Sequence, residues 1–239
     1  LAKLTNLVPE GGIWLNTQRP EWNDANNALA GKGLSVVTVA YLRRFITFWK
    51  AQLAGHETGP FVVNTAVATL LTEVQAIFNA YQKHLEGGFS DQARRAFMDD
   101  LGLVASAYRS SVYGNEATVT QIEVAAADVV DFLTVAQRYI EHTLRVNQRS
   151  DGLTHSYNIL HLREKEAAVE HLYLMLEGQV ALLSSGLLAA EETLTLLQSL
   201  RQSELYRADQ HAYMLYPNRT LPGFQEKNNV SAEQVAGSE

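Results

Sequence analysis

A short segment near the start of the chain, residues 19–27, gathers side chains that can carry chemistry. It reads Arg-Pro-Glu-Trp-Asn-Asp-Ala-Asn-Asn, and so combines carboxylates, an indole, carboxamides and a guanidinium. A loop that only connects two elements can be built from Gly, Ser and Asp. A sugar pocket needs a flat aromatic face, amides that bind hydroxyl groups, and a carboxyl group that moves a proton. The composition of this segment therefore points to carbohydrate chemistry.

Two acids in this segment are candidates for proton transfer. Cleavage of a glycosidic bond needs an acid that protonates the leaving oxygen, and an inverting enzyme also needs a base, or phosphate, on the opposite face of the ring. Asp24 and Glu21 are the predicted catalytic residues, and each would help to keep a proton on the other by repulsion. The alternative is that Asp24 or Asn23 caps a helix while Trp22 is a packing anchor. Glu177, in an otherwise apolar stretch, is either a base or a buried, paired structural residue.

Residues Glu21-Trp22-Asn23-Asp24 resemble the acid-bearing loop of the inverting glycoside hydrolases and phosphorylases of the six-hairpin (α/α) toroid superfamily, in particular the cellobiose phosphorylase-like group. That group carries an Asp-Trp-Asn-Asp-type motif whose last Asp is the general acid. The resemblance implies that Asp24 is the acid and that Trp22 and Asn23 shape the pocket, although Glu21 replaces the first Asp. It also implies the C-terminal portion of a catalytic domain, because the chain has about half the helices of a complete toroid. A partner chain or a missing segment would then complete the domain.

Two further polar groups are candidates for the same pocket. His155, Tyr157 and Asn158 lie in a break between expected helices, and His211 lies beside Arg207 in an irregular C-terminal stretch. Each group also has a structural interpretation, as a locally bonded hairpin or as a C-terminal wrap held by salt bridges. The predicted substrate-binding residues are Arg19, Trp22, Asn23, Asn26, Asn27, His155, Tyr157, Asn158 and His211.

Helical periodicity dominates the remainder of the chain. Residues 153–162 alternate between apolar and polar types and suggest a short hairpin or loop. We expect an all-α fold of antiparallel helical hairpins, part of an (α/α) toroid, with a single domain over residues 1–230 and a flexible tail over 231–239. The expected helices cover residues 34–53, 61–85, 90–113, 118 or 120 to 146, 164–184 and 189–203.

Composition narrows the classes of partner. The formal net charge of -7 argues against nucleic acid, and no apolar run approaches the roughly 20 residues that span a bilayer, so we expect no membrane partner. The absence of cysteine excludes disulfides and favours a cytoplasmic protein. His155 and His161 do not match a helical zinc pair, and we expect no metal and no organic cofactor.

These expectations lead to two functions. The first is cleavage of a glycosidic bond in an oligosaccharide or glycan, by hydrolysis or phosphorolysis, because no phosphate-binding signature chooses between them. The second is a non-catalytic helical scaffold or protein-interaction module. In that case residues 21–27 would have only a structural role, and the exposed faces of the helices would bind partner proteins.

Overall fold

The structure is a mixed α/β fold built around one antiparallel sheet. The computed structural model describes residues 1–15, 29–54, 59–114, 120–218, 220, 222–227 and 229–236. The sheet has the strand order β1-β2-β3-β6-β7. Its strands are β1 Leu7–Val8, β2 Gly12–Trp14, β3 Gly33–Ser35, β6 Tyr157–Leu162 and β7 Ala167–His171. The predicted all-α fold of helical hairpins in an (α/α) toroid is therefore wrong.

The sheet escaped prediction because its strands carry little local signal. Three of them are only two or three residues long, too short for alternation to show. The stretch predicted as a helix over 164–184 instead contains β7, which pairs with β6 from Leu162↔Ala167 to Asn158↔His171. Ala and Glu favour helices, but this pairing between strands overrides the local preference.

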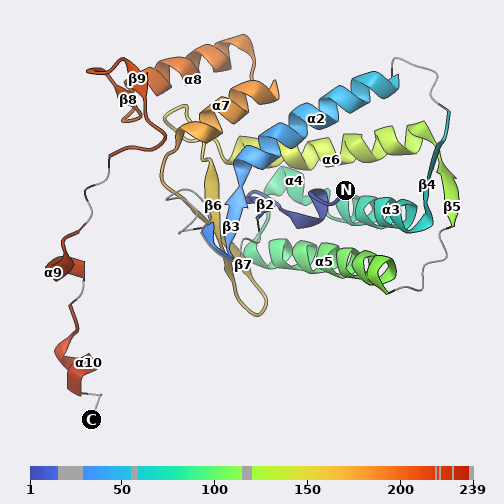
Figure 1. Ribbon diagram of the computed structural model, residues 1–239, viewed down its shortest axis with the longest axis horizontal. Helices are drawn as coiled ribbons and strands as arrows, with labels where there is room; N and C mark the ends of the chain where they lie inside the picture. Colours follow the sequence, from blue (N-terminus) through green and yellow to red (C-terminus); the bar gives the residue numbers. More distant parts are fainter. Residues whose placement is uncertain are drawn as a thin grey trace.

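The helices make up the larger part of the fold. The longer ones are α2 Val36–Ala54, α3 Thr65–Ala80, α5 Asp91–Tyr113, α6 Ala126–Val146, α7 Leu176–Ser185 and α8 Ala190–Gln202. In Figure 1, α2, α6, α3 and α5 extend together to one side of the sheet, while α7 and α8 lie above it. Helix α2 packs along α6 and α7, and α3 packs along α5. The short helices are η1 Leu4–Asn6, α4 His84–Gly87, α9 Phe224–Lys227 and α10 Ala232–Ala236.

The helices expected from residue 61 and from residue 118 or 120 begin later than expected, because each is preceded by a short strand and these two strands pair with each other. Strand β4 (Phe61–Asn64) pairs antiparallel with β5 (Gln121–Val124), far from the main sheet. Helices α3 and α6 follow these strands directly, and the side chain of Asn64 caps α3 by accepting from the Ala66 N–H at 2.8 Å. β-branched residues at both sites favour the extended backbone.

Other helix ends follow the predicted signals. The side chain of Ser90 accepts from the Ala93 N–H at 3.1 Å, so Ser90 is the N-cap of α5, at the start of the helix expected over residues 90–113. Gly186 ends α7 with φ of 71°, a left-handed conformation that suits glycine. Gly186 lies in the gap between the helices expected over residues 164–184 and 189–203.

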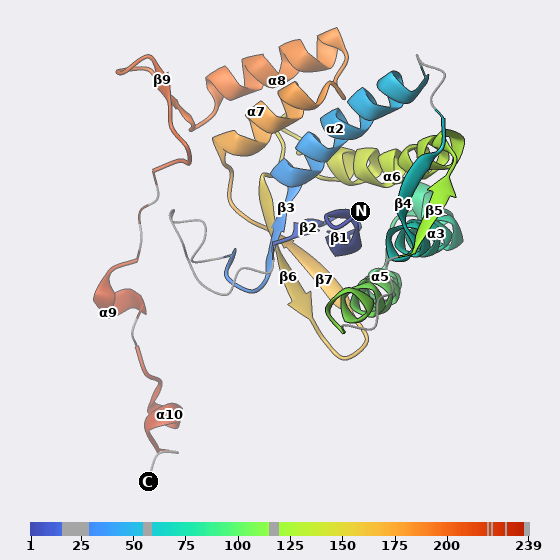
Figure 2. The same ribbon diagram turned by 45° about the vertical axis from the view of Figure 1, so that its right-hand side comes forward.

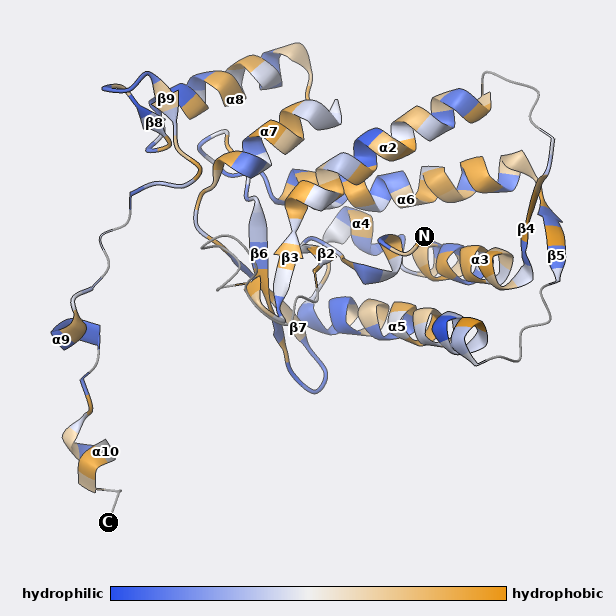
Figure 3. Cartoon of the chain, viewed as in Figure 1, coloured by the Kyte–Doolittle hydropathy of each residue, from blue (hydrophilic) through white to orange (hydrophobic). Residues whose placement is uncertain are grey.

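The main core lies between the helices. In Figure 3 the apolar residues of α3, α5 and α6 form stripes along the helices. Three rings meet where these helices pack: Phe78 lies 5.6 Å from Phe97 and 4.7 Å from Tyr139 between ring centroids, and all three are at most 1% exposed. Stacked and tilted rings of this kind add to the stabilisation that comes from burying their area.

A buried ion pair joins the sheet to the helices. The guanidinium of Arg94 on α5 donates to Glu10 Oε2 at 2.7 Å, and Glu10 lies in the turn between β1 and β2. Glu10 Oε1 accepts from the Phe89 N–H at 2.9 Å and lies 3.0 Å from His142 Nε2. Burial alone would raise the pKa of Glu10, but the hydrogen bonds from His142, Phe89 and Arg94 outweigh it and lower the pKa. Both carboxylate oxygens are thus fully used in holding the fold together.

The C-terminal part of the chain leaves the body of the protein. In Figure 2 the residues beyond α8 run through the hairpin of β8 (Tyr206–Arg207) and β9 (Ala212–Tyr213) and then extend away from the body through α9 and α10. Among the described residues, no helix combines the length and apolar composition that crossing a membrane requires.

Candidate functional site

The acid-bearing segment itself lies outside the described residues. Asp24, Glu21, Arg19, Trp22, Asn23, Asn26 and Asn27 all fall within 16–28. The nearest described residues on either side are Leu15 and Leu29. The Leu15 N–H donates to the Gly33 carbonyl of β3 at 3.0 Å, which ties one end of the segment to the sheet, and the Lys32 N–H donates to the Leu29 carbonyl at 3.2 Å in the turn that leads from the other end into β3.

Both ends also share one apolar cluster, which we call the tyrosine cluster. Leu29, Ile159 and Met175 are buried at its centre. Leu15 packs against them on one side. The other members are Tyr157, Leu172, Tyr173 and Tyr216. The chain therefore enters and leaves residues 16–28 beside the predicted pocket residue Tyr157.

Tyr157 begins β6 and lies beside a carboxylate. Burial raises the pKa of Tyr157, and a hydrogen bond with the carboxylate of Glu177 raises it further. Glu177 is the second residue of α7. Its Oε2 is buried and has no hydrogen-bond partner among the residues that the structure describes. A phenol and a carboxylate with one buried oxygen that has no partner among the described residues thus lie near each other at the edge of the tyrosine cluster.

The backbone around Glu177 is held on both sides. The Leu176 N–H donates to the Leu215 carbonyl at 2.8 Å, and the Gly178 N–H donates to Ser156 Oγ at 2.8 Å. The neighbouring Gln179 is fully buried and donates to the carbonyls of Thr154 and Met175 at 2.7 and 2.9 Å. These bonds connect the start of α7 to the segment before β6 and to the chain after β9.

A polar pocket of about 440 Å³ lies next to the cluster. Tyr173 belongs to both, because it packs in the tyrosine cluster and also lines the pocket. Arg149 and Asp151 in the wall form an ion pair at 2.7 Å, which lowers the pKa of Asp151. The lining residues come from four separate parts of the chain: Arg149, Asp151, Tyr173, Leu174, Gln202, Ser203, Glu204, Pro217 and Asn218.

The predicted residue His155 stacks on a histidine that the sequence did not single out. The rings of His155 and His171 lie 3.9 Å apart between centroids and within 5° of parallel. Burial, followed by the positive charges of His171 and Arg149, lowers the pKa of His155 to about 4. Burial and Arg149 also lower the pKa of His171. Both rings are therefore neutral near physiological pH, and they pack on each other.

Asn158 is fully buried and joins two parts of the fold. Its Nδ2 donates to the Gly11 carbonyl at 2.6 Å and to Asn147 Oδ1 at 2.8 Å. Its Oδ1 therefore accepts from His171 Nδ1, 2.8 Å away, which places the proton of His171 on Nδ1. Asn158 therefore has a structural role: it links the Gly11 carbonyl and Asn147 to His171 of the histidine pair.

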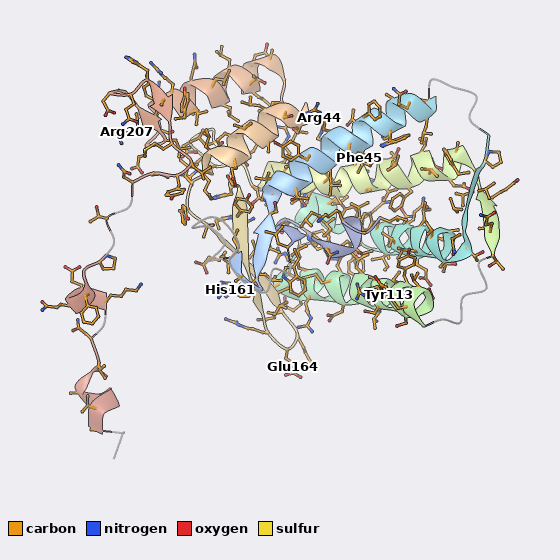
Figure 4. All side chains as sticks on the ribbon, in the orientation of Figure 1. Arg44, Phe45, Tyr113, His161, Glu164 and Arg207 are labelled. Atoms are coloured by element: carbon orange, nitrogen blue, oxygen red, sulfur yellow. The ribbon has the colours of Figure 1, made fainter. Side chains whose placement is uncertain are left out.

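His211 lies apart from these groups. It sits with φ of 48° in the turn between β8 and β9, exposed, and its Nδ1 is 3.4 Å from the Tyr206 hydroxyl. Figure 4 shows Arg207 of the same hairpin beyond the end of α8, far from His161 at the other end of β6. Arg207 pairs with Asp209 at 2.7 Å. Within the described part of the chain, the residues near 207–211 and those at 155–158 do not line one pocket.

A second groove differs in character. It measures about 350 Å³ and lies between α2, α3, α6 and the β4–β5 ladder, with Phe45, Trp49 and Phe61 among its apolar lining residues. Apart from the indole N–H of Trp49, the side chains that line it in the described part of the chain are apolar. In the described ranges, no three acidic or histidine side chains come together in a way that could hold a metal ion.

Sequence reasoning missed Tyr173, His171 and Asn218. Tyr173 fell within the helix expected over residues 164–184, and His171 and Asn218 acquire their places only when strands pair and the C-terminal part of the chain folds back. Comparisons with known proteins add no family: no protein-family model matches the chain, and no curated protein matches it.

Proposed function

We propose that this chain belongs to a carbohydrate-active enzyme that cleaves a glycosidic bond of an oligosaccharide or glycan. Asp24 is the general acid, and Glu21 is the second candidate. One observation supports the proposal most. Leu15 and Leu29, which flank the acid-bearing segment, share the tyrosine cluster with Tyr173, and Tyr173 also lines the polar pocket. The segment therefore leaves and rejoins the fold beside a pocket suited to a sugar.

The polar pocket has the size and chemistry of a small-molecule site. Its volume of about 440 Å³ lies within the range of roughly 300–1,000 Å³ that such pockets show. The tyrosine ring of Tyr173 suits the apolar face of a pyranose. Gln202 and Asn218 can donate to and accept from hydroxyl groups, and the carboxylate of Glu204 can accept from them. This combination binds a sugar better than the apolar groove beside α2 does.

In the proposed reaction, Asp24 lies at the glycosidic bond of the bound sugar and acts as a general acid. The carboxyl group of Asp24 gives its proton to the leaving oxygen as the bond from that oxygen to the anomeric carbon breaks. An oxygen of water or phosphate forms the new bond to the anomeric carbon. A second carboxylate nearby, Glu21, favours the protonated form of Asp24 through repulsion between like charges.

The test is the release of sugar from a panel of oligosaccharides, with and without inorganic phosphate. We expect Asp24→Asn to reduce the rate by about 10²–10⁴-fold, because amides cannot donate the proton. Asp131→Asn on α6 is the matched control, because Asp131 is exposed and lies outside the tyrosine cluster and the polar pocket. Equal activity of Asp24→Asn and the parent protein would remove Asp24 from its role.

A non-catalytic interaction module is the alternative, and the outer face of α2 favours it. Four aromatic side chains of this face are between 41% and 57% exposed: Tyr41, Phe45, Phe48 and Trp49. Exposed apolar patches of this kind mark interaction sites. If the parent protein releases no sugar, and if Phe45→Ser abolishes an association seen by sedimentation velocity, this alternative replaces the enzyme.

A further inference from the structure

We infer that a pocket between the start of the chain and α5 binds a small aromatic carboxylate with a hydroxyl group on its ring. We call it the indole pocket, because the ring of Trp14 lines it. It measures about 420 Å³ and shares no lining residue with the polar pocket, so the inference does not depend on the proposed cleavage of a glycosidic bond. Its lining residues are Thr5, Asn6, Leu7, Val8, Trp14, Met98, Gly102, Ala105, Ser106 and Arg109.

Two separate parts of the fold build the indole pocket. The segments η1, β1 and β2 supply one wall, and α5, which packs along η1 and β1, supplies the other. The lining positions on α5 are 98, 102, 105, 106 and 109, which follow the helical repeat and share one face. Leu7 and Val8 are 1% exposed and Ala105 is 6% exposed. The pocket therefore has a packed apolar floor, which suits the ring of a ligand.

The indole of Trp14 is held in a fixed position. Its Nε1–H donates to the Gly31 carbonyl at 3.1 Å. The ring packs, together with Met98, against the buried cluster around Leu34. Because the indole N–H is already used, Trp14 offers the ligand only the apolar surface of its ring. Contacts between this ring and an aromatic ligand add to the gain from burying apolar area.

Arg109 makes one end of the indole pocket positive. Its Nη2 donates to Ser106 Oγ at 3.0 Å, no acidic side chain lines the pocket, and no carboxylate in the described part of the chain pairs with Arg109. A guanidinium binds a carboxylate through two parallel hydrogen bonds, and the hydroxyl of Ser106, which accepts from Arg109, can donate its own proton to the same carboxylate. This end of the pocket therefore favours a carboxylate over a neutral group.

The wall formed by η1 has the opposite preference. The Thr5 hydroxyl and the Asn6 Nδ2 both donate to the Ala2 carbonyl, at 3.0 and 2.8 Å. The proton of the Thr5 hydroxyl is thus used, and the side-chain oxygens of Thr5 and Asn6 remain as acceptors. Such oxygens repel a carboxylate and accept from a hydroxyl group. The ligand therefore directs its carboxylate to Arg109 and its hydroxyl group to η1.

Gly102 leaves the volume of the pocket open. It lies within α5, where glycine destabilises a helix relative to alanine. A Cβ at this position would meet no atom within 4 Å, so packing within the described structure does not require a glycine. A ligand that occupies this space gives the glycine a reason. It also provides a test, because a larger side chain at position 102 fills the pocket without displacing a neighbour.

The first test is isothermal titration calorimetry of the full chain with 4-hydroxybenzoate near neutral pH. We expect one site with a Kd of about 1 mM or lower. Arg109→Met should weaken binding by about 10–100-fold, because charge-assisted hydrogen bonds are lost. The neutral 4-hydroxybenzamide, which has nearly the same shape, should show a similar loss on the parent protein. The matched control is Arg138→Met, since Arg138 is exposed on α6 and also donates to a neutral side chain, that of Gln82.

A second variant separates loss of the site from loss of the fold. Gly102→Leu should abolish binding of 4-hydroxybenzoate while the melting temperature stays at or above that of the parent, because leucine favours the helix. Ser110→Leu, at an exposed position of α5 outside the pocket, should bind as the parent does. A parent protein that shows no saturable binding, parent-like binding by Arg109→Met or Gly102→Leu, or equal affinity for 4-hydroxybenzamide would each overturn the inference. The release of sugar from oligosaccharides is measured separately and bears only on the proposed function.

Discussion

Replacement of Arg94 by methionine should lower the free energy of unfolding by about 4 kcal/mol near neutral pH, because removing one partner of a buried ion pair costs about 3–5 kcal/mol. The side chain of Arg94 is 6% exposed and that of Glu10 is 12% exposed, so water cannot replace the lost partner easily. The carbonyls of Pro9, Phe89 and Ala167 also lose a donor, at about 1 kcal/mol each. Glu10 keeps its bonds to Phe89 and His142, which limits the total.

Urea unfolding followed by far-UV circular dichroism measures this change. The control is Arg95→Met on the next residue, where the partners are 26% and 55% exposed and the expected loss is below about 1 kcal/mol. Combining Arg94→Met with Glu10→Gln should cost less than the sum of the two single changes, because the buried charge goes together with its partner. If Arg94→Met unfolds at the same urea concentration as Arg95→Met, the ion pair does not hold the sheet to α5.

Two further predictions concern the histidine pair and a glycine in the sheet. Since the pKa of His155 is lowered from 6.5 to about 4, the unfolded chain binds more protons between these values, and stability should fall by about 2 kcal/mol as the pH drops through that window. His155→Phe keeps the stacked ring and should remove that part of the pH dependence; an unchanged slope in urea unfolding would refute it. Gly12→Ala should destabilise by more than about 2 kcal/mol, because φ is 131° and a Cβ would lie 2.8 Å from the backbone of Ser35. Gly102→Ala, which meets open space in α5, should instead stabilise by about 0.5–1 kcal/mol, and thermal unfolding that ranks the two variants otherwise would contradict this account.

The parts of the fold that depend on local signals were predictable from the sequence. Helix α5 shows this well: it covers the range expected from helical periodicity, Ser90 caps it, and Phe97 and Leu101, four residues apart, are at most 1% exposed. The sheet was not predictable in this way. Strand β3 is three residues long and pairs with β6, more than a hundred positions away, so its structure depends on contacts that no local pattern records.

The candidate site likewise has residues that the sequence pointed to and contacts that only the folded chain creates. Residue type pointed to Tyr157, which lies in the tyrosine cluster, and to Asn158, whose amide proves to be buried in a structural network. The polar pocket joins Arg149 to Asn218 through the end of α8, and such proximity arises only when the chain folds back. Glu177 was singled out as an acid among apolar residues, but only the structure shows that one of its oxygens lacks a donor among the described residues.

The central claim is that the segment around Trp22 and the polar pocket form one sugar-binding site. The chain has three tryptophans, and Trp14→Phe with Trp49→Phe leaves Trp22 as the only one. We predict that the oligosaccharide cleaved by the parent protein changes the fluorescence of Trp22 in a saturable way, and that adding Tyr173→Ala removes this response. Unchanged Trp22 emission at oligosaccharide concentrations that saturate cleavage would contradict the claim.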